Sequence, residues 1–157
     1  MIEVKVVKLG IDVTSKMPVI ILKEKEGEKS LPIWIGLFEA QAIAFALGKV
    51  KPPRPLTHDL AKLLIEKLDG KLDRVVISEV INNTYYARLF IQRNRENLQV
   101  DSRPSDAIAL ALRFKAPIFI NETILKKLAL GSKPISDEEV EGFKKKLKDL
   151  RPKDLTG

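Results

Sequence analysis

The chain of 157 residues contains no cysteine. This absence excludes disulfide bonds, thiolate metal sites and cysteine nucleophiles, and it removes any argument for an oxidising compartment. His58 is the only histidine, so a single side chain is well suited to proton transfer near neutral pH. No apolar run approaches the roughly 18 residues of a membrane-spanning helix, and the first residues lack the plan of a signal peptide. We therefore expect a cytoplasmic protein without a membrane partner.

The composition is typical of a folded, water-soluble protein. Hydrophobic residues make up 45% of the chain and charged residues 31%, which argues against a disordered chain. The length suits one domain with its own hydrophobic core. Lysine greatly outnumbers arginine and amide side chains are few, a bias that favours a thermophilic source.

Excess positive charge is the first indication of a partner. The formal net charge is +7. Residues 136–157 contain six acidic and six basic side chains, so the excess lies upstream of them. A basic surface attracts polyanions, and nucleic acid is the partner that it favours. A lysine-rich surface that only keeps the protein soluble is the alternative.

Hydrophobic patterns predict an α+β fold. Apolar and β-branched segments predict strands at residues 2–9, 17–23, 31–35, 72–81, 84–92 and 98–101, with a tight turn at Asn82-Asn83. Helices are expected at residues 38–47 with Gly48 as C-cap, at residues 57–68 with Thr57 as N-cap, and from Pro104 onward.

An internal repeat underlies this order. Residues 42–47 (AIAFAL) and 107–112 (AIALAL) match at five of six positions, and each segment follows three strands. Chance similarity of alanine-rich helices is the alternative, but the shared order favours two strand-strand-strand-helix repeats. Both helices are apolar on all sides, so each must be covered on more than one side. We expect them to be buried between sheets. A subunit interface is the alternative, and a homo-oligomer, first of all a dimer, is the expected assembly.

Residues 133–157 are expected to form a C-terminal helical tail after a domain of residues 1–132. Residues 136–139 (SDEE) are a capping box, and Val140, Phe143, Leu147 and Leu150 recur at helical spacing. We expect this tail to pack on the body or on a partner.

The first polar cluster lies at residues 101–106 (DSRPSD). If Pro104 begins the helix, Asp106 lies beside free backbone amides at its positive end. One interpretation is structural, a capped helix in which Arg103 pairs with Asp101 or Asp106. The other is a divalent cation held by the two carboxylates, beside a phosphate gripped by Arg103. Glu39, early in the other apolar helix, is a further candidate acid.

The second polar cluster, at residues 54–60 (RPLTHDL), contains His58, a candidate general acid or base. Asp59 could orient His58 or bind a metal, and an ordinary first-turn carboxylate is the alternative. Neighbouring residues on a helix diverge by about 100°. His58 and Asp59 therefore need not face one site.

Four motifs in this order resemble the bifunctional nuclease domain family. They are LPIWIG at 31–36, EAQAI at 39–43, RPLTHDL at 54–60 and DSRPSDAIALA at 101–111, and the match covers about residues 1 to 130. What the resemblance implies is a nuclease that hydrolyses phosphodiester bonds of RNA and DNA with little sequence preference.

On that basis the chemistry of the motif residues suggests metal-assisted hydrolysis. The expected ligands of Mg²⁺ or Mn²⁺ are Asp101, Asp106 and Glu39. The expected catalytic residues are His58, Asp59, Asp101 and Asp106. The expected phosphate-binding residues are Arg103, Arg54, Lys49 and Lys51.

The alternative is a non-catalytic nucleic-acid-binding or oligomeric assembly domain whose polar clusters only cap helices and seal an interface. Geometry separates the two hypotheses. Catalysis requires Asp101, Asp106, His58 and Arg103 to converge on one cleft.

Overall fold

The computed structural model of the chain describes residues 1–131 and 147–149. The strands are β1 (Ile2–Asp12), β2 (Pro18–Glu24), β3 (Ser30–Trp34), β4 (Gly70–Ile81), β5 (Thr84–Arg93), β6 (Glu96–Ser102), β7 (Ile118–Ile120) and β8 (Leu147–Asp149). The helices are α1 (Leu37–Leu47), α2 (Thr57–Lys67), α3 (Pro104–Phe114) and α4 (Glu122–Gly131). The predicted α+β class and its two strand-strand-strand-helix units are confirmed.

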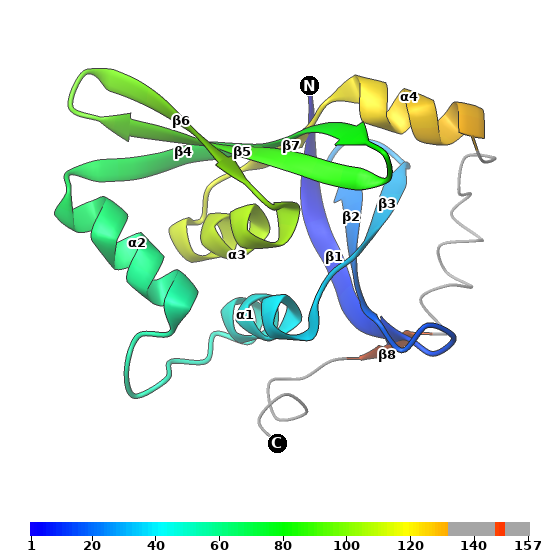
Figure 1. Ribbon diagram of the computed structural model, residues 1–157, viewed down its shortest axis with the longest axis horizontal. Helices are drawn as coiled ribbons and strands as arrows, with labels where there is room; N and C mark the ends of the chain where they lie inside the picture. Colours follow the sequence, from blue (N-terminus) through cyan, green and yellow to red (C-terminus); the bar gives the residue numbers. More distant parts are fainter. Residues whose placement is uncertain (132–146, 150–157) are drawn as a thin grey trace.

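Strands β1–β3 and strands β4–β6 form the two halves of one sheet, so the expectation of separate sheets is wrong. Its order is β3-β2-β1-β7-β4-β5-β6. The short strand β7, which the sequence patterns did not predict, joins the halves: it pairs antiparallel with β1 and parallel with β4. Figure 1 shows the halves at a steep angle to each other, with α1 and α3 in the space that they enclose.

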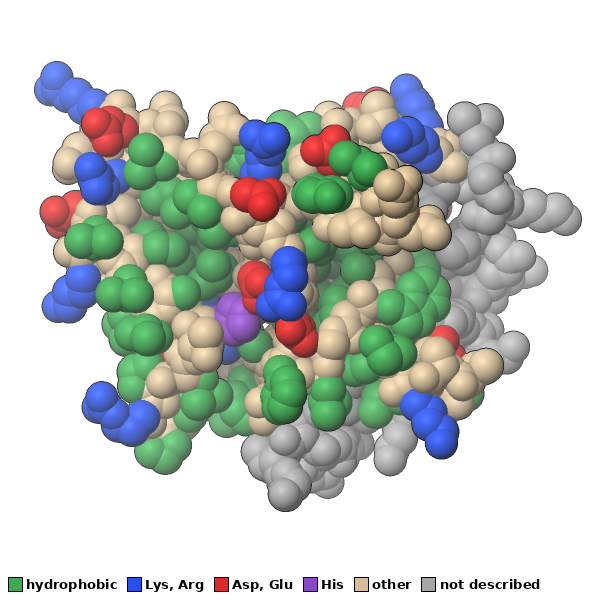
Figure 2. All heavy atoms as spheres, in the orientation of Figure 1, with side chains coloured by type: hydrophobic (Ala, Val, Ile, Leu, Met, Phe, Trp, Pro, Cys, Tyr) green, Lys and Arg blue, Asp and Glu red, His purple; other side chains and the backbone are tan. Residues whose placement is uncertain are grey.

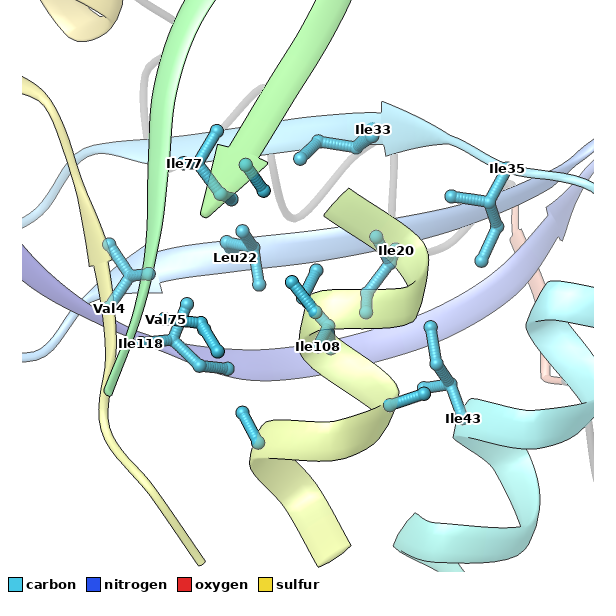
Figure 3. Packing of buried hydrophobic residues seen from close by; sticks show 14 of the residues in the cluster. Val4, Ile20, Leu22, Ile33, Ile35, Ile43, Val75, Ile77, Ile108 and Ile118 are labelled. Atoms are coloured by element: carbon cyan, nitrogen blue, oxygen red, sulfur yellow. The ribbon is translucent and has the colours of Figure 1, made fainter. Parts of the chain in front are cut away.

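The core is built around α3, as its apolar sequence predicts. Residues Ala107 to Ala111 are all buried, and both halves of the sheet contribute to the same apolar cluster. In Figure 3, Ile108 lies among side chains of β2 (Ile20, Leu22) and β4 (Val75, Ile77). Small alanines let α1 and the sheet approach α3 closely. The helix is therefore enclosed on several sides.

Local signals explain most element boundaries. Asn82 and Asn83 both have positive φ (49° and 60°), as the predicted tight hairpin between β4 and β5 requires. Thr57 is the first residue of α2 and not its N-cap as predicted. Instead, the carboxylate of Asp59 accepts a hydrogen bond of 3.0 Å from the backbone N–H of Leu56.

The predicted tail helix is wrong where the structure describes the tail. Leu147–Asp149 form β8, which pairs antiparallel with Gly10–Asp12 of β1. Along the edge of β1 that faces away from β2, β7 pairs only with Ile2–Val4. The other end of this edge therefore has backbone groups with which β8 pairs. The rest of the predicted tail lies outside the described residues. Among the described helices, none is long and apolar enough to cross a membrane.

Replacing Ile108 by alanine is expected to destabilise the fold by roughly 2–5 kcal/mol, because it leaves a cavity where both halves of the sheet meet α3. Urea unfolding followed by circular dichroism measures the change. Leu47→Ala, at an exposed position of α1, is the control and should cost less than about 1 kcal/mol. Equal costs for the two variants would contradict the central position of α3.

Candidate functional site

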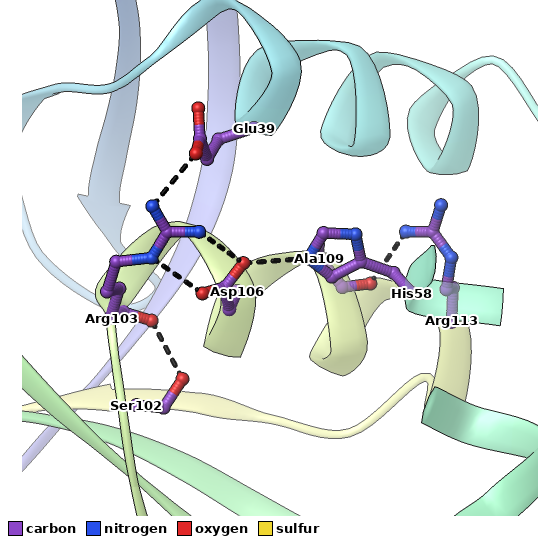
Figure 4. Close-up of polar contacts among 7 residues, drawn as sticks. All are labelled: Glu39, His58, Ser102, Arg103, Asp106, Ala109 and Arg113. Atoms are coloured by element: carbon purple, nitrogen blue, oxygen red, sulfur yellow. Dashed lines mark hydrogen bonds and ion pairs between the residues drawn. The ribbon is translucent and has the colours of Figure 1, made fainter. Parts of the chain in front are cut away.

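A chain of polar contacts joins the first turns of three helices. Asp106 Oδ1 lies 2.8 Å from His58 Nε2. Arg103 donates from Nε to Asp106 Oδ2 at 2.8 Å and from Nη2 to Asp106 Oδ1 at 3.1 Å. Its Nη1 donates to Glu39 Oε1 at 2.8 Å. Figure 4 shows Arg103 between Glu39 and Asp106, with His58 on the other side of Asp106.

The local sequence explains why these side chains meet. Strand β6 runs almost directly into α3, and Arg103, in extended conformation (φ −70°, ψ 148°), is the N-cap residue between them. Pro104 occupies the first turn as predicted, and Asp106 follows Arg103 by three residues, the spacing that puts both on one side of a helix. Glu39 and Asp106 both lie in first turns, where the helix dipole favours a negative charge.

A second contact fixes α2 on α3 and was not predicted. Arg113 donates from Nε to Asp59 Oδ1 at 2.8 Å and from Nη1 to the carbonyl of Ala109 at 3.0 Å. The Arg113 side chain is buried, with 8% exposure. Asp59 thus binds a structural arginine, whereas His58 faces Asp106, as the divergence of neighbouring helical residues allows. The signal for this contact in the sequence was Arg113 itself, a basic residue in the last turn of an apolar helix.

The partners of the two aspartates keep them ionised. Burial raises the pKa of Asp106, but hydrogen bonds from Arg103 and His58 outweigh burial and lower that pKa below its ordinary value. Burial likewise raises the pKa of Asp59, and bonds from Arg113 and the Leu56 backbone reverse the effect. His58 therefore faces a carboxylate that carries its full negative charge at neutral pH.

The cluster lies in a groove of about 900 Å³ between α1, α2 and the start of α3. Apolar side chains such as Phe38, Leu56 and Leu60 line it beside the polar residues. Figure 2 shows the purple histidine next to acidic and basic side chains near the centre of this face. Within the part of the chain that the structure describes, His58 Nδ1 has no hydrogen-bond partner. His58 thus lines the groove with one ring nitrogen bound to Asp106.

Besides Asp59, four predicted site residues lie outside the cluster. Asp101 pairs with Arg88 in the β5–β6 ladder, and both neighbours of Arg88 on β5, Ala87 and Leu89, are buried in the core. Since side chains alternate along a strand, Asp101 faces away from α3. The other three, Lys49, Lys51 and Arg54, are exposed in the loop between α1 and α2, beside the groove but without a contact to the cluster among the described residues.

The predicted ligands do not form a cation site in this arrangement. Arg103 occupies the space between the carboxylates of Glu39 and Asp106, and Asp101 is directed elsewhere. In residues 1–131 and 147–149, no group of three or more His, Asp or Glu side chains is arranged to hold a metal ion. The use of Mg²⁺ or Mn²⁺ stays a prediction that a cleavage assay decides.

Asp106→Asn is expected to reduce stability at neutral pH and much less in acid. Because the pKa of Asp106 is lower in the folded chain, its charge stabilises the fold above the unfolded pKa of about 3.9. That contribution is lost as the pH falls through the lowered folded pKa. Urea unfolding should show a difference of roughly 1–3 kcal/mol at pH 7, shrinking toward pH 3.

Asp73→Asn is the matched control, because Asp73 is exposed and, within the described residues, pairs only with its neighbour Arg74. It should change stability by less than about 0.5 kcal/mol at both pH values. A cost of Asp106→Asn that is the same at pH 7 and pH 3 would contradict the charged network.

The groove lies within a region that matches a known protein family. The bifunctional nuclease domain matches residues 20–133. An uncharacterized protein of Mycobacterium tuberculosis is 40% identical over 162 residues, which cover 98% of this chain and 97% of that protein. Bifunctional nuclease 1 of Oryza sativa subsp. indica is 32% identical over 109 residues, 67% of this chain and 33% of that protein. Bifunctional nuclease 1 of Arabidopsis thaliana is 30% identical over 109 residues, with 67% and 34% coverage. The chain belongs to the bifunctional nuclease domain family.

Proposed function

We propose that this chain is a nuclease that cleaves phosphodiester bonds of RNA and DNA in the groove around His58. The observation that carries the proposal is the convergence of His58, Asp106 and Arg103, from two helices, on one groove. The names of the plant relatives, and the excess positive charge upstream of residue 136, support the same class of substrate.

His58 is the residue that moves a proton. Asp106 holds Nε2 at 2.8 Å and fixes the orientation of the ring, so Nδ1 is the nitrogen left for the substrate. Nδ1 accepts a proton from a water molecule whose oxygen bonds to the phosphorus, and the protonated ring gives a proton to the leaving oxygen as its P–O bond breaks. The negative charge of Asp106 stabilises the protonated ring during this exchange.

Arg103 is the residue that binds the phosphate. A guanidinium has five N–H donors, and the contacts to Asp106 and Glu39 use one on each nitrogen. The second donors on Nη1 and Nη2 remain for phosphate oxygens, and the side chain is 63% exposed. Glu39 positions the guanidinium from the opposite side. Lys49, Lys51 and Arg54 extend the positive charge along the neighbouring loop.

A structural role is the second candidate, because one observation favours it. The same contacts tie α1, α2 and α3 together, and the charge of Arg103 is balanced by Glu39 and Asp106. A non-catalytic nucleic-acid-binding or assembly domain needs nothing more from these residues. Activity measurements on folded variants separate the two candidates.

Purified protein is expected to cleave fluorescent single-stranded RNA and DNA, and His58→Gln should lower kcat/KM by roughly 100- to 10,000-fold. Arg103→Gln should also lower kcat/KM, chiefly by raising KM, because phosphate binding is lost. Assays with Mg²⁺, with Mn²⁺ and with EDTA decide whether the reaction uses a metal. Asp101→Asn shows whether that carboxylate contributes.

Arg93→Gln is the matched control, since Arg93 also pairs with an acidic residue three positions along the chain, Glu96, but lies away from the groove. Its activity should equal that of the unmodified protein. Circular dichroism verifies that every variant is folded. Cleavage that persists undiminished in folded His58→Gln protein, or that is absent from the unmodified protein, would favour the structural role.

A further inference from the structure

Strand β6 leaves one edge of the sheet open. It is the last strand in the sheet order and, among the described strands, it pairs only with β5. All residues from Glu96 to Asp101 are exposed. An edge of this length presents unpaired backbone donors and acceptors, and soluble proteins usually block such an edge or use it for pairing.

The open edge exposes apolar side chains that belong to the core face of the sheet. Leu98 lies opposite Ile91 and Val100 opposite Leu89, and both partners on β5 pack in or against the core. Leu98 and Val100 therefore point to the helix side of the sheet, yet they are 38% and 44% exposed. The core face of the sheet is therefore left partly uncovered at the last strand.

Helix α2 adds leucines to this uncovered surface. The helix has no buried residue. Leu63, Leu64 and Leu68 are exposed and, unlike Leu56 and Leu60, do not line the groove. At about 100° per residue, Leu63 and Leu64 lie on the side of the helix away from His58. Figure 2 shows apolar side chains gathered on the left of this face, where Figure 1 places α2 and the β5–β6 turn.

We propose that a second copy of this chain covers this surface by pairing its β6 antiparallel to this β6, with the two-fold axis at Gln99. In this register Leu98 lies opposite the partner's Val100, and Val100 opposite the partner's Leu98. The two halves of the dimer then share one continuous sheet, with the helices of both copies on the same side.

The sequence of β6 favours a second copy because it is self-complementary in this register. Glu96 faces the partner's Ser102, and Asp101 faces the partner's Asn97, so no two carboxylates oppose each other. Centring the pair on Leu98 would put Glu96 opposite the partner's Val100. Centring on Val100 would put Leu98 opposite the partner's Ser102. Only the register centred on Gln99 pairs both apolar residues with each other.

A stable dimer needs apolar contacts beyond the edge strand, because it buries roughly 800 Å² on each subunit. The exposed leucines of α2 lie on the same side of the sheet as Leu98 and Val100, so the partner can bury them together with the strand. Apolar burial and backbone pairing then act at one interface.

Cross-linking tests the position of the axis, because the natural chain has no cysteine to interfere. Residues directly opposite in an antiparallel pair have Cα atoms about 4.5–5.5 Å apart, which suits a disulfide. Gln99→Cys should form a disulfide-linked dimer under mild oxidation, seen on a non-reducing gel. Gln92→Cys, at an exposed position on β5, should cross-link at least ten times more slowly.

Sedimentation over a dilution series tests the apolar contact. The unmodified chain should be a dimer, and Leu98→Lys or Val100→Glu alone should raise the dimer dissociation constant at least tenfold. The two substitutions together should recover most of the loss, since the register puts the new opposite charges face to face. Val13→Lys, at an exposed apolar position of the β1–β2 turn, is the control and should leave the dimer intact.

Three results would overturn the proposal. The first is a monomer at all concentrations, which would leave the surface to a different partner. The second is a dimer that Leu98→Lys does not weaken. The third is an equal cross-linking rate for Gln99→Cys and Gln92→Cys. Both cysteine positions are exposed, so these variants are expected to fold. The cross-linking comparison therefore decides the question even where a charged variant does not fold.

Discussion

The burial of α3 is the constraint on which the rest of the structure depends. Because its middle, Ala107 to Ala111, is enclosed by α1 and both halves of the sheet, its ionisable groups are confined to its two ends. Helix α2 binds both ends: His58 meets Asp106 at the start, and Asp59 meets Arg113 near the end. The packing of an alanine-rich helix thus determines where the only histidine of the chain lies.

The Asp106 carboxylate has two roles that support each other. A half-buried carboxylate is costly unless it is paired and hydrogen-bonded, and Arg103 and His58 supply those bonds from opposite sides. The same bonds fix the ring of His58 and the guanidinium of Arg103 at the edge of the groove. Stability and orientation come from one set of contacts. A variant of Asp106 therefore disturbs both, and activity has to be measured on variants of His58 and Arg103 as well.

Turns and helix starts that depend on neighbouring residues could be predicted from the sequence, whereas contacts between residues far apart in the chain could not. The hairpin at Asn82-Asn83 and the start of α3 at Pro104 follow from local turn and helix chemistry. The contact between His58 and Asp106 joins residues 48 apart in the sequence. The motifs therefore indicated both residues as site candidates but did not predict that they are in contact. Asp101 was grouped with Asp106 because they are close in sequence, whereas strand alternation turns Asp101 to the opposite face of the sheet. The unpaired end of β1 overrides the helical pattern at Leu147–Asp149.

Strand β6 connects the candidate site with the proposed dimer interface. Gln99, at the proposed axis, precedes Arg103 by only four residues on a nearly continuous path. Among the described strands of one chain, β6 pairs only with β5, so the backbone that positions Arg103 has a partner on one side. Pairing with a second β6 gives it a partner on both sides, which restricts the movement of Arg103 relative to Asp106.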